Sequence, residues 1–85
     1  MQKIHYDCIG TCSSCIDLVI DDEDRIVKAE FTDGCNGNLQ GIAHLVQGMK
    51  CDEVISRLKG ISCNGGPTSC PDQLARALQG RKVNN

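Results

Sequence analysis

The spacing of apolar residues changes once along this sequence, near residue 31, and that change constrains the fold more than any other feature. Before it, apolar and polar residues alternate over 16–20 and again over 27–31, with an acidic turn between the two stretches. Alternation is typical of β-strands with one buried face, so the pattern predicts a hairpin with Val27 on the inward face. The stretch 3–7 (KIHYD) predicts a third strand.

Beyond residue 31 the apolar residues recur at helical spacing. The pattern predicts a helix over 36–48, a second over 52–59 and a third over 71–79. Strands followed by helices predict an α+β fold: a two- or three-stranded antiparallel sheet followed by three helices packed on one face. Lys28 and Glu30 indicate that the other face of the sheet meets water, which antiparallel sheets tolerate.

The chain has 85 residues, and we expect one domain over 1–85 with frayed ends at 1–9 and 81–85. It holds one Phe, one Tyr and no Trp, so the core is thin, and a domain this small commonly needs a disulfide, a metal or a partner to stabilise it. Seven cysteines supply candidates for the first two.

Charge and hydropathy exclude several classes of function. The net charge is −2 without a run of Lys or Arg, so we expect no contact with nucleic acid. No signal-peptide pattern and no long apolar stretch are present, so we expect no membrane contact and a cytoplasmic location. Thiols stay reduced there, which favours metal or redox chemistry over structural disulfides.

Three cysteines lie where a turn meets the end of a predicted element, and a fourth lies in a loop. Cys12 is in the turn before the hairpin, Cys35 precedes the first helix, Cys63 lies in a Gly-rich loop and Cys70 begins the third helix. If their thiolates converge, they suit a tetrahedral zinc site. Spacing alone does not establish zinc, because the chain has a single CxxC, from Cys12 to Cys15.

Cys70 occupies a position that favours the thiolate. Pro71 suits the first position of a helix, which predicts Cys70 as the N-cap. A sulfur there faces unpaired backbone N–H groups and the positive end of the helix dipole. Thiolates bind metals and attack electrophiles, so Cys70 is a candidate for either chemistry.

The other cysteines have simpler interpretations. The CxxC of Cys12 and Cys15 is also compatible with a redox dithiol, but such motifs normally open a helix and this one runs into a strand. Cys8, Cys15 and Cys51 are interpreted as small, buried apolar residues.

The remaining polar candidates are also weaker than the four cysteines. His5 and His44 are possible metal ligands, and His44 is better explained as a partly exposed residue on a helix face. Asp72 is interpreted as an acid in the first turn of its helix. Gly65 and Gly66 lack the neighbouring lysine of a phosphate-binding loop.

Two segments of the chain resemble a known family. TSCPDQLARAL and, upstream, FTDGCNGNLQGIAHLVQGMKCDEVISRLKGISC are similar to the TSCPD-domain family, and the resemblance extends over 10–80. The family comprises small bacterial proteins and a domain at the C-terminus of some cobalamin-dependent ribonucleotide reductases. The resemblance implies a four-cysteine pattern, carried here by Cys12, Cys35, Cys63 and Cys70. It also implies association with ribonucleotide reductase and thus with DNA synthesis.

Three functions follow from this resemblance and from the residues. The first is a metal-binding accessory module, with zinc as the cofactor. The second is a thiol redox accessory to ribonucleotide reductase, with Cys63 and Cys70 as the couple. The third is a scaffold or carrier for iron or an iron–sulfur cluster, because Cys12, Cys35 and Cys70 resemble the three cysteines of cluster-assembly scaffolds. A chain of 85 residues has no room for the radical-bearing barrel of a reductase, so we expect no independent reductase activity.

Overall fold

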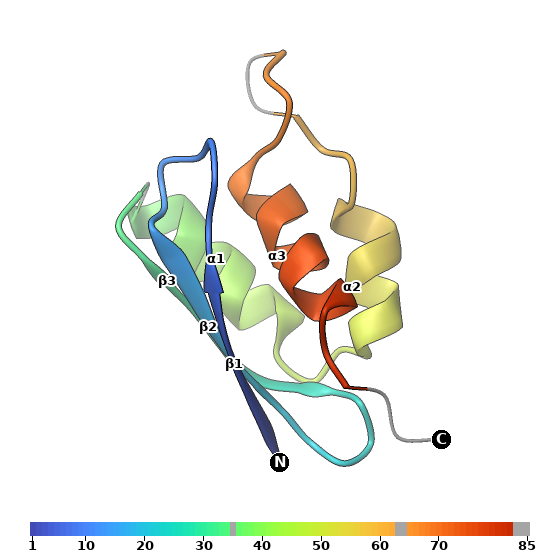
Figure 1. The fold of residues 1–85 in the computed structure, drawn as a ribbon. Coiled ribbons are helices and arrows are strands. Elements are labelled where there is room, and N and C mark those ends of the chain that lie inside the picture. Colours follow the sequence, from blue (N-terminus) through green and yellow to red (C-terminus); the bar gives the residue numbers. More distant parts are fainter. Residues whose placement is uncertain (35, 63–64, 83–85) are drawn as a thin grey trace.

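The computed structural model describes residues 1–34, 36–62 and 65–82. Over these residues the chain forms a three-stranded antiparallel sheet followed by three helices, which confirms the predicted α+β fold. The elements are β1 (Gln2–Asp7), β2 (Cys15–Ile20), β3 (Ile26–Thr32), α1 (Asn36–Val46), α2 (Cys51–Leu58) and α3 (Cys70–Gln79). Figure 1 shows the helices on one side of the sheet.

The sheet has β2 at its centre, paired with β1 on one side and with β3 on the other. Along β2 the side chains of Ile16, Leu18 and Ile20 are buried, as their alternation with polar residues predicts. The register with β1 places His5 opposite Asp17. The stretch predicted as a third strand is therefore β1, which lies at one edge of the sheet, with β3 at the other.

The inward-facing residue at the start of β3 is Ile26, and the prediction that Val27 faces inward is wrong. Val19 pairs with Lys28 whereas Ile20 pairs with Ile26, so Val27 is an extra residue at an irregularity in the register. Such a bulge changes the face on which the following side chains lie. The Val27 side chain is therefore 39% exposed, whereas Ile26 is buried.

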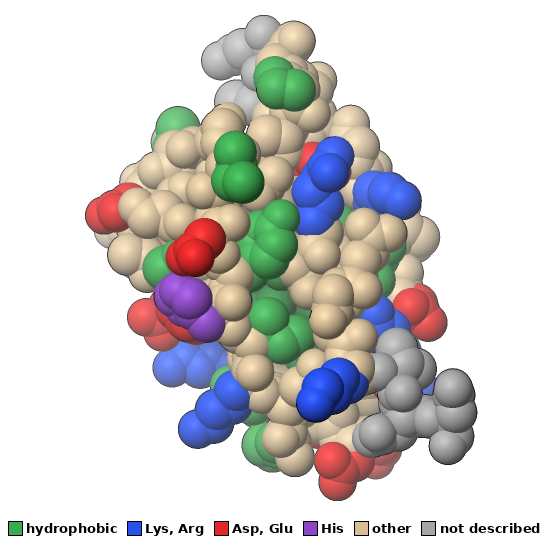
Figure 2. All heavy atoms as spheres, in the orientation of Figure 1, with side chains coloured by type: hydrophobic (Ala, Val, Ile, Leu, Met, Phe, Trp, Pro, Cys, Tyr) green, Lys and Arg blue, Asp and Glu red, His purple; other side chains and the backbone are tan. Residues whose placement is uncertain are grey.

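The core lies between β2 and the helical layer. Its buried members include residues from β2 and β3 and from all three helices: Ile16, Leu18, Ile20, Ile26, Ala29, Val46, Cys51, Val54, Leu74, Ala77 and Leu78. Figure 2 shows apolar side chains at the seam between the sheet and the helices. Burial of Cys51 confirms its interpretation as a core residue. Within the described part of the chain, no helix is long and apolar enough to cross a membrane.

The outer face of the sheet is polar, as predicted. Lys28 and Glu30 form an ion pair there with an N–O distance of 3.3 Å, and both side chains are about 60% exposed. Figure 2 shows histidine atoms beside acidic side chains on the sheet side of the molecule. This face can therefore carry polar chemistry without disturbing the core.

A buried arginine joins the end of the chain to the sheet. The side chain of Arg81 is 5% exposed, and its Nε lies 2.7 Å from Asp24 Oδ1 in the β2–β3 turn. Its Nη2 lies 2.8 Å from Asp52 Oδ1 at the start of α2. The hydrogen bonds from Arg81 hold the pKa of Asp24 below its ordinary value.

Candidate functional site

The β1–β2 loop, the end of β3 and the start of α3 lie at the same end of the molecule (Figure 1). An open pocket of about 330 Å³ lies between the β1–β2 loop and the segment that precedes α3. Its lining is Gly10, Thr11, Cys12, Gly66, Pro67, Thr68 and Cys70. We call it the cysteine pocket.

Three hydrogen bonds donated by backbone N–H groups hold the β1–β2 loop at this position. The backbone N–H of Cys8 donates to the Ser14 carbonyl at 2.9 Å, and the Ser14 N–H donates to the Thr32 carbonyl at 2.8 Å. The Ile9 N–H donates to Gln73 Oε1 of α3 at 3.2 Å. The amide nitrogen of the same glutamine donates to Thr68 Oγ1 at 2.9 Å. Buried Gln73 thus joins the two segments that form the pocket.

The sulfur of Cys70 accepts hydrogen bonds from the β1–β2 loop. Ser13 Oγ lies 3.1 Å from Cys70 Sγ. Burial raises the pKa of the Cys70 thiol, but hydrogen bonds from the side chain and backbone of Ser13, the Thr11 hydroxyl and the Cys12 backbone outweigh it. The pKa of Cys70 therefore lies below its ordinary value, which favours the thiolate.

Cys8 is a second thiol beside Ser13, with the opposite electrostatic character. Ser13 Oγ lies 3.7 Å from Cys8 Sγ, farther than it lies from Cys70. Burial is the largest influence on the Cys8 thiol and raises its pKa. The same hydroxyl thus faces both sulfurs, and the arrangement favours negative charge on Cys70 rather than on Cys8.

The N-cap of α3 is Ser69, and the prediction of Cys70 at this position is wrong by one residue. Ser69 Oγ accepts from the Asp72 N–H at 3.2 Å and donates to the Ile61 carbonyl at 2.6 Å. Serine is a preferred N-cap, and Pro71 is tolerated within the first turn because the N–H groups there have no partner inside the helix. Cys70 is therefore the first residue of the helix.

Asp72 lies in the first turn of α3, as predicted, but it is also a buried structural centre. Its carboxylate accepts from Thr68 Oγ1 at 2.5 Å, from the Gly60 N–H at 2.8 Å and from Arg76 Nε at 2.8 Å. These hydrogen bonds lower the pKa of Asp72 to about 2, and the one from Thr68 has the largest effect. Because Gly60 and Thr68 lie at the two ends of the α2–α3 loop, the carboxylate ties both ends of that loop to the first turn of α3.

The structure brings two of the four predicted ligands, Cys12 and Cys70, into the cysteine pocket. Cys35 and Cys63 lie outside the described residues. The residue before Cys35, Gly34, has φ +95°, and a Cβ built on it would be 2.7 Å from Leu39 Cδ1, 3.3 Å from Ser13 N and 3.5 Å from the carbonyl carbon of Cys12. The end of β3 therefore packs directly against the Cys12–Ser13 segment, and a side chain at position 34 would disturb that contact.

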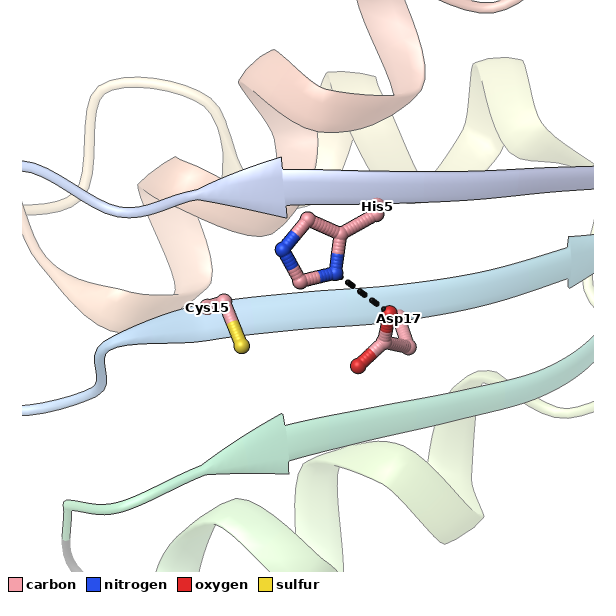
Figure 3. Close-up of side chains that lie close together, drawn as sticks. All are labelled: His5, Cys15 and Asp17. Atoms are coloured by element: carbon pink, nitrogen blue, oxygen red, sulfur yellow. Dashed lines mark hydrogen bonds and ion pairs between the residues drawn. The ribbon is translucent and has the colours of Figure 1, made fainter.

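A separate polar cluster lies on the outer face of the sheet. His5 on β1 and Cys15 and Asp17 on β2 each offer one metal-ligating atom, and these atoms lie within 4.8 Å of one another (Figure 3). Sequence reasoning considered His5 as a ligand and Cys15 as a buried residue, but it did not join them to Asp17. This grouping requires the cross-strand register, because His5 and Asp17 lie 12 positions apart in the sequence.

The two histidines differ in their surroundings. His5 Nδ1 lies 2.7 Å from Asp17 Oδ1, and the hydrogen bond to Asp17 raises the pKa of the imidazole. His44 is exposed on α1, as predicted. Among the two, only His5 belongs to the metal-compatible group found in the described residues.

Comparison with known proteins gives one match. The family model described as the TSCPD domain matches residues 2–82, which is nearly the whole chain. No curated protein and no solved structure is significantly similar to this chain.

Proposed function

The chain belongs to the TSCPD-domain family, and from that membership and the cysteine pocket we propose that it is a metal-binding module, with zinc held by Cys12, Cys35, Cys63 and Cys70. The observation that carries the proposal is the set of hydrogen bonds from the Cys12–Ser13 segment and Thr11 to the Cys70 sulfur. These hydrogen bonds bring Cys70 close to Cys12, which lies 58 positions earlier in the sequence.

The chemistry of the donors in the cysteine pocket fits zinc. A ligating thiol must lose its proton, and the environment of Cys70 already favours the thiolate. Hydrogen bonds from backbone N–H groups and hydroxyls to a ligating sulfur orient it and offset its negative charge. Four sulfur ligands leave no open coordination position, which is typical of structural zinc sites.

The surrounding contacts support the remaining two ligands. Gly34 packs against the Cys12–Ser13 segment, and Cys35 is its chain neighbour. Asp72 ties down both Gly60 and Thr68, which flank the loop that contains Cys63. Bound zinc would contribute on the order of 10 kcal/mol to folding, which is comparable to the net stability of a small domain. A core with few aromatic residues gains most from such a contribution.

We propose a ribonucleotide reductase as the partner. The domain would bind it as an accessory or regulatory module. This assignment rests on the resemblance to the domain appended to cobalamin-dependent reductases. A direct binding measurement between the zinc-loaded protein and the reductase tests it, and absence of binding at micromolar concentrations contradicts it.

Elemental analysis of protein purified without added metal tests the zinc site. We expect about one tightly bound zinc per chain, lost in Cys12→Ser and in Cys70→Ser. Cys15→Ser is the matched control, because Cys15 lies on β2 outside the cysteine pocket, and it retains the tight zinc. A brown product on anaerobic reconstitution would instead identify an iron–sulfur cluster. A metal-free protein as isolated, with unchanged folding, contradicts the proposal.

The low pKa of Cys70 also favours a second candidate function, a thiol redox accessory to ribonucleotide reductase. The couple would be Cys63 and Cys70, which lose two protons and two electrons to an acceptor as they form a disulfide. Thiol counting before and after mild oxidation separates the candidates. Seven free thiols, no metal and facile loss of two thiols favour the redox function.

A further inference from the structure

The outer face of the sheet carries a set of three different metal-ligating groups that the four-cysteine pattern does not include. His5, Cys15 and Asp17 supply an imidazole nitrogen, a sulfur and a carboxylate oxygen, all within 4.8 Å of one another. Figure 3 shows the three side chains on the same face of β1 and β2. In antiparallel strands, residues directly opposite each other have close Cβ atoms, and His5 is directly opposite Asp17. The ordinary backbone pairing of two strands therefore assembles the cluster.

A fourth residue completes the arrangement expected around a ligating histidine. His5 Nε2 lies 3.2 Å from Asp7 Oδ1, and Asp7 is the cross-strand partner of Cys15. Histidine ligands commonly donate the N–H of their second nitrogen to a carboxylate, which fixes the tautomer and the ring orientation. With Asp7 at Nε2, the nitrogen free to bind a metal is Nδ1, which faces Asp17.

The distance between the candidate ligand atoms needs little change. His5 Nδ1 and Asp17 Oδ1 are 2.7 Å apart, a hydrogen-bond distance. Two ligand atoms at about 2 Å from a tetrahedral zinc ion are roughly 3.3 Å apart, so a small side-chain rotation is sufficient. The carboxylate and a thiolate also supply two negative charges to balance a divalent cation, and zinc accepts nitrogen, sulfur and oxygen ligands.

We propose that His5, Cys15 and Asp17 form a second zinc site, exposed to solvent and distinct from the cysteine pocket. Side chains of His5 and Asp17 are 59% and 51% exposed, so the ion would exchange readily with solvent. A surface hollow of about 310 Å³ lies beside them, lined also by Lys28 and Glu30. Three protein ligands leave one coordination position for water or for a donor from another molecule, as in open zinc sites.

A zinc titration of the full-length protein, followed by NMR of the imidazole nitrogens, tests this inference. We expect zinc to shift the His5 Nδ1 resonance, whereas the resonances of His44 stay unchanged, because His44 is exposed on α1 with no place in the cluster. Cys15→Ser and Asp17→Asn should each raise the zinc concentration that gives half of the His5 shift by at least about tenfold. Asp7→Asn should also raise this concentration, by about 10-fold or more, as for other carboxylates that orient a ligating histidine.

Two control variants make the result specific. His44→Ala should leave the His5 response unchanged. Glu53→Gln should do the same, because Glu53 lies on α2, outside the metal-compatible group. Equal responses of the two histidines, no response at His5, or a response that survives Cys15→Ser would each overturn the inference. In the last case zinc would bind at His5 without the Cys15 sulfur, and the three-ligand site would be wrong.

The outcome is independent of the proposed function. Cys70→Ser should abolish the tight zinc of the cysteine pocket and leave the His5 response intact. His5→Ala removes the second site and should leave the tight zinc of the cysteine pocket in place. Failure of either site alone therefore identifies which of the two assignments is wrong.

Discussion

Replacement of Asp72 by asparagine should destabilise the protein in a pH-dependent manner. The side chain is 1% exposed and accepts hydrogen bonds from Thr68, Gly60 and Arg76. Its pKa is lowered from 3.8 to about 2 in the folded protein. A difference of this size corresponds to about 2 kcal/mol of stability, at about 1.4 kcal/mol per pH unit. Asparagine keeps the shape of the side chain but cannot carry the charge.

The sign follows from the direction of the shift. A carboxyl whose pKa is depressed by folding stabilises the protein fully above its unfolded pKa and loses that contribution as the pH falls through the folded value. The difference in unfolding free energy between the wild type and Asp72→Asn should therefore be about 2 kcal/mol above pH 5. It should fall to roughly half of that at pH 3.

Urea unfolding followed by circular dichroism at 222 nm, at several pH values between 3 and 7 and under reducing conditions, measures this difference. Asp22→Asn is the matched control, because the Asp22 side chain is 90% exposed, and we expect it to change stability by less than about 0.5 kcal/mol. A loss in Asp72→Asn that is the same at pH 3 and pH 7 would refute the assignment of the buried charge. So would a loss no larger than that of the control.

Three further substitutions test other contacts. Ser69→Ala removes the N-cap of α3 and should cost about 1 kcal/mol in urea unfolding, whereas a change below 0.3 kcal/mol would contradict that role. Ser13→Ala removes a donor to the Cys70 sulfur and should move the pH profile of Cys70 alkylation upward, measured by mass spectrometry, and an unchanged profile would contradict this role. Arg81→Met leaves the carboxylate of Asp24 without its guanidinium and should cost about 2 kcal/mol, and full stability would show that the pair is dispensable.

The element order could be predicted from local patterns. Alternation along β2 and helical spacing along α1 are properties of near neighbours in the chain, so they predict a strand and a helix without knowledge of the rest of the fold. The register could not be predicted in the same way. Ile26 faces the core in place of Val27 because of a bulge between β2 and β3, and a bulge is a property of two paired strands.

The candidate ligands were predicted from their positions at element ends and from the resemblance to the TSCPD-domain family. Cys12 and Cys70 both line the cysteine pocket, and the four-cysteine ligand set stays a prediction. The roles of Ser13 and Gln73 were not predicted, because a single serine or glutamine carries no pattern of its own, and Cys8 was predicted only as a buried apolar residue. Their roles depend on contacts between the β1–β2 loop and α3.

By itself, the sequence determined the α+β order of elements, the polar outer face of the sheet and the identity of the family, because each depends on residue types along a continuous stretch of chain. Only the tertiary structure decided that the Cys12–Ser13 segment donates hydrogen bonds to Cys70. It also decided that buried Asp72 accepts hydrogen bonds from both ends of the α2–α3 loop, and that His5 faces Asp17. The physical reason is that hydrogen bonds and metal ligation act over a few ångströms. Which distant residues come that close is decided by strand register and by the packing of α3 against the sheet.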